Sequence, residues 1–231
     1  MKKRSKRYKL IEKKKVKEKL NLNKSLDLIK ETCTSKMNES IDLSIKINTK
    51  QSKGGDFNLR TVVKLPHGNG KKFKIAVLCE QEKVEEAKKV GADIAGSQDL
   101  LDKISSGELN FDKLICTPGM MTKIGKLGKI LGPKGLMPNP KLGTVNENVQ
   151  IAVKEAKAGQ AEIRNDKDGN IGVSIGKKSF SNESLIKNYK AIIETLEKEK
   201  SNNTLKGDLI KSSFITSSMG VSYKLKLEKN I

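Results

Sequence analysis

The segment Ser40-Ile-Asp-Leu-Ser-Ile-Lys-Ile-Asn48 alternates polar and apolar side chains without a break. Successive side chains of a β-strand point to opposite faces, so this pattern predicts a strand with one face in the core and the other in solvent. The run from Leu59 to Leu65 is expected to pair with it, and the polar, glycine-rich segment Gln51–Asp56 would connect the two. This part of the chain therefore predicts an antiparallel sheet.

The same style of sequence returns after residue 158. A turn signal, Asp168-Gly169, separates two short apolar runs, and a helix with one apolar face is expected at Ser181–Lys200. The expected strands cover residues 161–165, 171–175, 212–217 and 221–227. The C-terminal part thus also predicts antiparallel strands covered on one side by a helix.

The middle of the chain differs, since all five prolines fall between residues 66 and 140. Apolar runs at Phe73–Leu78 and Phe111–Cys116 predict buried strands, and helices are expected at Gln81–Val90 and, opened by a Ser N-cap, at Ser97–Ser105. With a short strand between the helices, this order predicts a parallel α/β unit.

Because both ends share one style and the middle has another, we predict a mixed α/β and α+β fold with two domains. Residues 1–66 and 160–231 would form a discontinuous antiparallel-sheet α/β sandwich, and residues 67–159 an inserted Rossmann-like parallel α/β domain. Two independent terminal domains of about 65–70 residues would each bury little core, which favours the insertion.

The charge balance indicates the class of partner. Lysine and arginine total 47 and aspartate and glutamate 27, a net charge of +20, so a polyanion is expected to bind. The basic block in the first twenty residues is either a solvated tail or an arm lying along phosphates. No apolar stretch approaches the roughly 20 residues that span a bilayer, and the basic start lacks a secretory apolar segment. We expect a cytoplasmic protein with no membrane partner.

The residues that usually carry metal or nucleophilic chemistry are sparse. Cys33, Cys79 and Cys116 are far apart, and His67 is the only histidine, so there is no zinc-type spacing. Spacing alone does not exclude a catalytic Cys–His pair, but scattered thiols are more often core residues. We expect no metal, no cofactor and no enzymatic activity.

The segment Gly119–Gly143 is the most unusual in the chain, with six glycines, five lysines and no acidic residue. It lacks both the Walker pattern and Gly-x-Gly-x-x-Gly, which disfavours a nucleotide site. Lysines 123, 126 and 129 would share a face if the segment is helical, and that face is either solvated or a second contact for nucleic acid.

Within this segment, Lys126 to Lys141 (KLGKILGPKGLMPNPK) resembles the signature of the bacterial-type ribosomal protein family numbered one in the large subunit, the stalk-protein family. Four further stretches follow in family order, so the resemblance covers nearly the whole chain. They are Lys64–Gly68, Gly91–Asp93, Ile163–Gly169 and Ser218–Gly220.

The resemblance implies a binding protein. Its discontinuous domain would bind large-subunit ribosomal RNA at the mobile stalk, as a monomer within the ribosome. The stalk would assist release of deacylated transfer RNA from the exit site. The same surface would bind the leader of the chain's own operon messenger RNA and so repress translation of that messenger RNA.

Carried over from the family, the RNA-binding residues would be Lys36, Met37, Ser40, Asp42, Asp166, Lys167, Ser212, Ser218, Met219 and Gly220. Their hydroxyls and carboxylates can bond to ribose hydroxyls, their lysines attract phosphate, and Gly220 would allow close approach. This chain departs from the family at Met37, where an aromatic residue is usual, and at Ser218, where threonine is usual. Aromatic residues make up 3% of the chain, which favours recognition of RNA shape over base stacking.

Two other classes of function remain as alternatives. The central α/β unit could serve a nucleotide-dependent enzyme, an idea that rests on fold analogy alone. A nonspecific, chromatin-like basic protein would bind duplex DNA as well as it binds stalk RNA.

Overall fold

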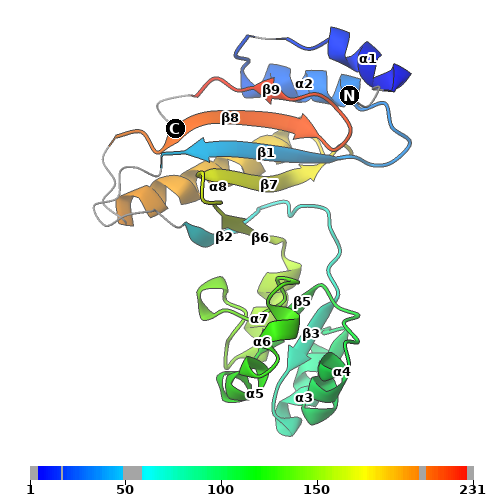
Figure 1. The fold of residues 1–231 in the computed structure, drawn as a ribbon, viewed down its shortest axis with the longest axis vertical. Coiled ribbons are helices and arrows are strands. Elements are labelled where there is room, and N and C mark those ends of the chain that lie inside the picture. The colour runs from blue at the N-terminus through cyan, green and yellow to red at the C-terminus, as the bar shows by residue number, and fades with distance from the viewer. Residues whose placement is uncertain (1–4, 17, 49–58, 203–206, 228–231) are drawn as a thin grey trace. The chain divides into compact units, whose positions relative to one another are not determined.

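The structure is a computed structural model that describes residues 5–16, 18–48, 59–202 and 207–227 (Figure 1). It forms two compact units: unit 1 from Met1–Gly70 with Ala161–Ile231, and unit 2 from Lys71–Gln160. Unit 1 holds an antiparallel sheet and unit 2 a parallel one, which confirms the predicted fold class. The expected loop Gln51–Asp56 and residues 1–4 and 17 of the basic block lie outside the described residues.

The main sheet of unit 1 is centred on the strand that the alternating pattern predicted. Its order is β7 (Asn170–Lys177), β1 (Ser40–Ile47), β8 (Ile210–Ser217) and β9 (Tyr223–Lys224), and the pairs are antiparallel. Every second side chain of β1 is at most 1% exposed, as expected for a half-buried strand: Ile41, Leu43, Ile45 and Ile47.

The predicted pairing between the first two runs is wrong. Strand β2 (Arg60–Lys64) pairs with β6 (Gln160–Arg164) in a separate two-stranded sheet, because both edges of β1 are occupied by β7 and β8. Asn165 helps to fix this pairing, since its Oδ1 accepts from the Leu59 amide at 2.6 Å. An alternating pattern defines which face is buried, but it does not specify the neighbouring strand.

The predicted hairpin around Asp168-Gly169 is also altered. Strands β6 and β7 belong to different sheets, and an isolated antiparallel bridge, Asn165 to Ile171, joins them at the turn. The last strand is shorter than expected, because the chain changes partner. The Leu225 amide bonds to Ser213 O, whereas the Lys226 amide donates to Leu20 O at 2.8 Å.

Two helices cover the apolar face of the main sheet. Helices α2 (Leu22–Thr32) and α8 (Asn182–Asn202) both pack in the core of unit 1, and Figure 1 shows α8 passing behind the strands and α2 beside β9. The predicted cap of α8 is confirmed, since Ser181 Oγ accepts from the Ser184 amide at 3.2 Å. Its predicted apolar face is buried as well: Leu185, Tyr189, Ile192, Ile193 and Leu196.

Part of the basic block forms a helix that packs on unit 1. Helix α1 (Lys6–Lys13) begins at Ser5, whose Oγ accepts from the Tyr8 amide. Ile11 is 4% exposed and packs in the core of unit 1. Residues 6–13 are therefore not a solvated tail.

Unit 2 is a parallel sheet with helices on both faces. Strands β3 (Ile75–Leu78), β4 (Ile94–Gly96) and β5 (Lys113–Cys116) lie in the order β4-β3-β5. One face packs against α4 (Gln98–Ser105), α5 (Met121–Gly125) and α6 (Gly128–Leu131), and the other against α3 (Gln81–Lys89) and α7 (Val149–Lys157). The predicted order of strands and helices is confirmed. The predicted cap is not, because Ser97 stands at the start of α4 but its side chain makes no capping bond.

Candidate nucleic-acid interface

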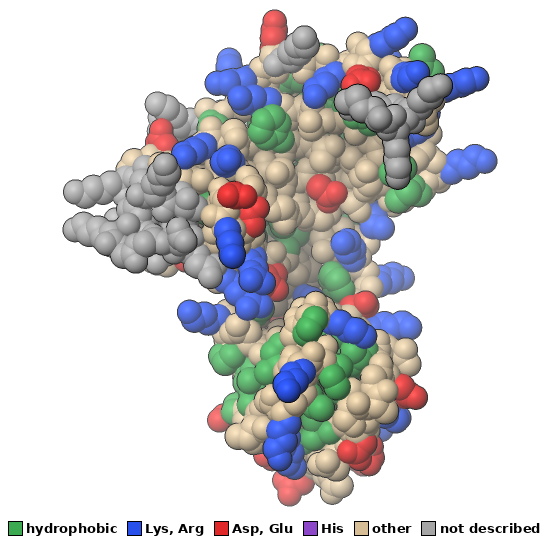
Figure 2. All heavy atoms as spheres, in the orientation of Figure 1, with side chains coloured by type: hydrophobic (Ala, Val, Ile, Leu, Met, Phe, Trp, Pro, Cys, Tyr) green, Lys and Arg blue, Asp and Glu red, His purple; other side chains and the backbone are tan. Residues whose placement is uncertain are grey.

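The face of the main sheet opposite α2 and α8 is polar and open. On β1 it carries Ser40, Asp42, Ser44 and Lys46, which alternate with the buried residues. The register pairs Asp42 with Thr216, Ser44 with Phe214 and Lys46 with Ser212 on β8. Figure 2 shows this face of unit 1 as mainly uncharged polar side chains and backbone, with lysine and arginine side chains gathered around it.

Seven of the ten predicted RNA-binding residues gather at one end of this sheet. We name them the Met219 cluster: Lys36, Met37, Ser40, Asp42, Ser218, Met219 and Gly220. Hydrogen bonds between Ser40 and Ser218 join its two chain segments, among them one from the Ser218 amide to Ser40 O at 3.0 Å and one from the Ser40 amide to Ser218 Oγ at 3.2 Å.

The Met219 cluster exposes apolar side chains in polar surroundings. Met37 is 55% exposed and Met219 is 49% exposed, although large apolar side chains are normally buried. Thioethers are flexible and polarizable, so they can pack against the face of a base or a sugar. The Met219 cluster therefore offers apolar contacts beside hydroxyls and a lysine.

The need for glycine at position 220 arises within the protein. A Cβ at Gly220 would lie 2.3 Å from Ser217 Oγ, and Ser217 is itself buried. Any side chain at position 220 would therefore displace Ser217, whether or not RNA is bound. Met219, whose side chain is 49% exposed, is therefore the position at which a substitution can test RNA contact without this displacement.

Asp166 shapes a turn. Its two carboxylate oxygens accept from the Asn170 amide at 2.6 Å and from Asn170 Nδ2 at 2.9 Å. These bonds with Asn170 lower the pKa of Asp166. Gly169, with φ of 78°, closes the turn. Asp166 thus stabilises the turn, and the turn presents the exposed Lys167.

The remaining three predicted residues lie away from the Met219 cluster. Lys46, near the far end of β1, is paired with Ser212 on one side and with Asn170 on the other. Ser212 and the Asp166 turn, which ends at Asn170, therefore flank that end of β1. Six residues of strand, about 20 Å, separate that end from Ser40. The structure thus places the predicted residues in two sets, connected by the open polar face.

Two residues that the sequence analysis did not single out contact the Met219 cluster directly. Arg7 donates to Met219 O at 2.8 Å, and Glu39 Oε2 accepts from the Met219 amide at 3.1 Å. A signal for Glu39 was present, because the alternation of Ile41, Leu43 and Ile45 puts residue 39 on the buried face. No sequence pattern distinguishes Arg7 from the basic residues around it.

Comparison with known proteins identifies the family. A model of the ribosomal protein L1p/L10e family matches residues 29–221, which include both sets of predicted residues. The chain belongs to this family. It is 68% identical to the large ribosomal subunit protein uL1 of Pelagibacter ubique (strain HTCC1062) over 89% of this chain and 90% of that protein.

More distant relatives bear the same name. The protein of Prochlorococcus marinus (strain NATL1A) is 48% identical over 89% of this chain and 86% of its own length. That of Thermosipho africanus (strain TCF52B) is 46% identical over 97% of each. Members of this family are ribosomal proteins, so the chain has its place in the ribosome, in the cytoplasm, as the sequence predicted.

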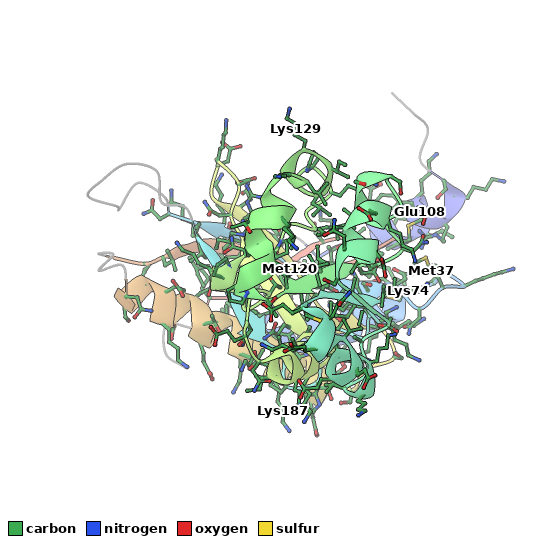
Figure 3. All side chains as sticks on the ribbon, turned by 90° about the horizontal axis from the view of Figure 1, so that it is seen from below. Met37, Lys74, Glu108, Met120, Lys129 and Lys187 are labelled. Carbon is green, nitrogen blue, oxygen red and sulfur yellow. The ribbon has the colours of Figure 1, made fainter. Side chains whose placement is uncertain are left out.

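The family signature at Lys126–Lys141 has a structural part and an exposed part. Leu131 is fully buried against the parallel sheet of unit 2, and Gly132 lies so close to Gly128 O that a Cβ would be 2.7 Å from it. Helices α5 and α6 are separate and short, so the three lysines at 123, 126 and 129 do not follow one continuous helix face. Figure 3 shows Lys129 projecting outward from α6.

The thiols are core residues, as predicted. Cys33, Cys79 and Cys116 are buried, and burial raises the pKa of each, to about 11 for Cys116. They are therefore protonated at neutral pH and are poor nucleophiles. Within the described ranges, no helix has the length and apolar character to cross a membrane.

Proposed function

We propose that this chain is a structural component of the large ribosomal subunit and that unit 1 binds ribosomal RNA of the mobile stalk near the exit site. The observation that carries the proposal is the Met219 cluster, in which hydrogen bonds between Ser40 and Ser218 join two chain segments while Met37 and Met219 stay half exposed. The naming of its relatives as large-subunit proteins supports the same role.

The chemistry of the surface suits RNA better than DNA. Asp42 and the hydroxyls of Ser40 and Ser218 can bond to ribose 2′-hydroxyls, which DNA lacks. Lys36 and Lys167 are exposed and can approach phosphates. The net charge of +20 adds attraction for any polyanion, so discrimination must come from the fixed hydroxyls, carboxylate and methionines.

Two further roles extend the proposal. The protein would assist release of deacylated transfer RNA from the exit site, with the exposed lysines of unit 2 at 123, 126, 129, 134 and 141 as a second contact for nucleic acid. It would also repress its own operon by binding the messenger RNA leader through the Met219 cluster. We assign RNA binding to the domain formed by residues 1–66 and 160–231, and we assign the second contact to the inserted domain formed by residues 67–159.

Filter binding at one fixed salt concentration tests the proposal. The full chain should bind isolated stalk ribosomal RNA at least tenfold more tightly than duplex DNA or scrambled RNA of equal length. The operon leader should compete for the same site. Equal affinity for all three nucleic acids would overturn the proposal in favour of a nonspecific basic protein. Saturable binding of ATP or a dinucleotide by the full chain would instead favour the enzyme alternative.

A further inference from the structure

The backbone of Met219 is held at both its N–H and its carbonyl by charged side chains. Its N–H donates to the carboxylate of Glu39 at 3.1 Å, and its carbonyl accepts from the guanidinium of Arg7 at 2.8 Å. Hydrogen bonds to charged partners are stronger than those between neutral groups. The backbone that carries the exposed Met219 side chain is therefore fixed before any RNA arrives.

Glu39 joins the two loops of the Met219 cluster. It is fully buried, and its second carboxylate oxygen accepts from the Ser35 amide at 3.3 Å. Burial raises the pKa of Glu39, but hydrogen bonds, among them those from Ser35 and Met219, outweigh it and lower the pKa. A buried carboxylate that remains ionised acts as a strong acceptor for both amides.

Arg7 reaches the same place from the N-terminal helix. Its Nη1 donates to Thr34 Oγ1 at 3.2 Å, so one guanidinium contacts the loop before β1 and the loop after β8. Helix α1 is held against unit 1 by buried Ile11 and by an ion pair between Lys14 and Glu31 at 2.6 Å. The fork of Arg7 is thus presented on an anchored element, whereas an arm lying along phosphates would leave it free.

We propose that Arg7 and Glu39 are positioning residues that fix the backbone of Met219 and so preform the RNA-binding surface. This inference rests on the proposed function. Ordering a loop during binding costs affinity, so a loop ordered in advance binds more tightly and more selectively. In this account the N-terminal helix contributes geometry to RNA recognition, in addition to positive charge.

Conservative variants of the full chain separate geometry from charge. Arg7→Lys keeps the charge but loses the planar fork that bonds Thr34 and Met219 together. Glu39→Gln keeps the shape but places an NH2 group where one of the two amides needs an acceptor. Lys6→Gln, on the same helix, removes a charge and leaves the fork intact, so it serves as the control.

Two readouts are needed, affinity and amide exchange. Arg7→Lys and Glu39→Gln should each weaken binding of stalk RNA on the order of tenfold, with affinity for scrambled RNA and the salt dependence unchanged. Hydrogen–deuterium exchange of residues 217–221 in the free protein should become faster in Glu39→Gln while the unfolding transition stays cooperative. Lys6→Gln should change affinity for both RNAs by less than twofold.

The outcomes distinguish this inference from the proposed function. If the unmodified chain prefers stalk RNA but both variants bind it as well as the unmodified chain, positioning by Arg7 and Glu39 is refuted. If the variants lose affinity for scrambled RNA equally, the two residues do not act on specific recognition and the inference is again refuted. If the unmodified chain shows no preference, the proposed function fails, and unchanged exchange at 217–221 in Glu39→Gln would then refute the positioning role independently.

Discussion

Truncating Met219 to alanine should weaken RNA binding without destabilising the protein. Full burial of a methionine side chain contributes about 1.5–3 kcal/mol. Because 49% of Met219 is exposed in the free protein, covering it with RNA would contribute about 0.7–1.5 kcal/mol. That corresponds to a loss of about three- to twelvefold in Kd for Met219→Ala, near the lower end because alanine keeps its Cβ.

The assay is a titration of fluorescently labelled stalk RNA with the full chain, together with a thermal unfolding curve. Ile151→Ala is the matched control, since Ile151 is 50% exposed but lies on α7 of unit 2. The reasoning is refuted if Met219→Ala binds within twofold of the unmodified chain while folding normally. It is also refuted if Ile151→Ala loses as much affinity.

Three further predictions concern other parts of the account. Met37→Phe should tighten binding of stalk RNA, because base–aromatic stacking contributes about 1–3 kcal/mol. Unchanged or weaker binding in the same titration would mean that position 37 contacts no base. The pKa of Glu39 is lowered in the folded protein, so Glu39 contributes stability at pH values above its ordinary pKa of 4.5, and this contribution is lost as pH falls through the folded-state pKa. The melting temperature should therefore fall less steeply between pH 7 and pH 3 in Glu39→Gln than in the unmodified chain. Parallel curves for the two proteins would contradict this prediction. Asn188→Leu should destabilise unit 1 by about 3 kcal/mol or more in urea unfolding. The reason is that the Asn188 side chain accepts from the His67 amide and donates to the carbonyls of Gly68 and Ile175. A loss below about 1 kcal/mol would mean that these groups find other partners.

The sequence predicted elements well where the pattern depends on local burial. The alternation along Ser40–Asn48 and the apolar face of Ser181–Lys200 each report which side of an element faces the core, and both are confirmed. Strand partners could not be predicted in the same way, because the pairing of β2 with β6 depends on contacts between residues about one hundred positions apart. Helix α7 was not predicted at all, although Asn148 caps it through the Gln150 and Ile151 amides.

The candidate site shows the same division. The resemblance supplied the residues of the Met219 cluster, and the structure brings seven of them to one end of the sheet. The roles of Arg7 and Glu39 depend on hydrogen bonds between residues that are 212 and 180 positions apart in the sequence, and no local pattern encodes such bonds. The internal constraint on Gly220 also depends on the fold, because the atom closest to an added Cβ would be Ser217 Oγ.

The central claim is that unit 1 binds one specific site on ribosomal RNA through the Met219 cluster. A chemical footprint of the full chain on whole large-subunit ribosomal RNA, with and without Met219→Glu, tests it most directly. The account predicts protection confined to one compact stalk segment, lost in Met219→Glu while the variant remains folded. Protection scattered along the RNA, or a stalk footprint that persists unchanged in Met219→Glu, would contradict it.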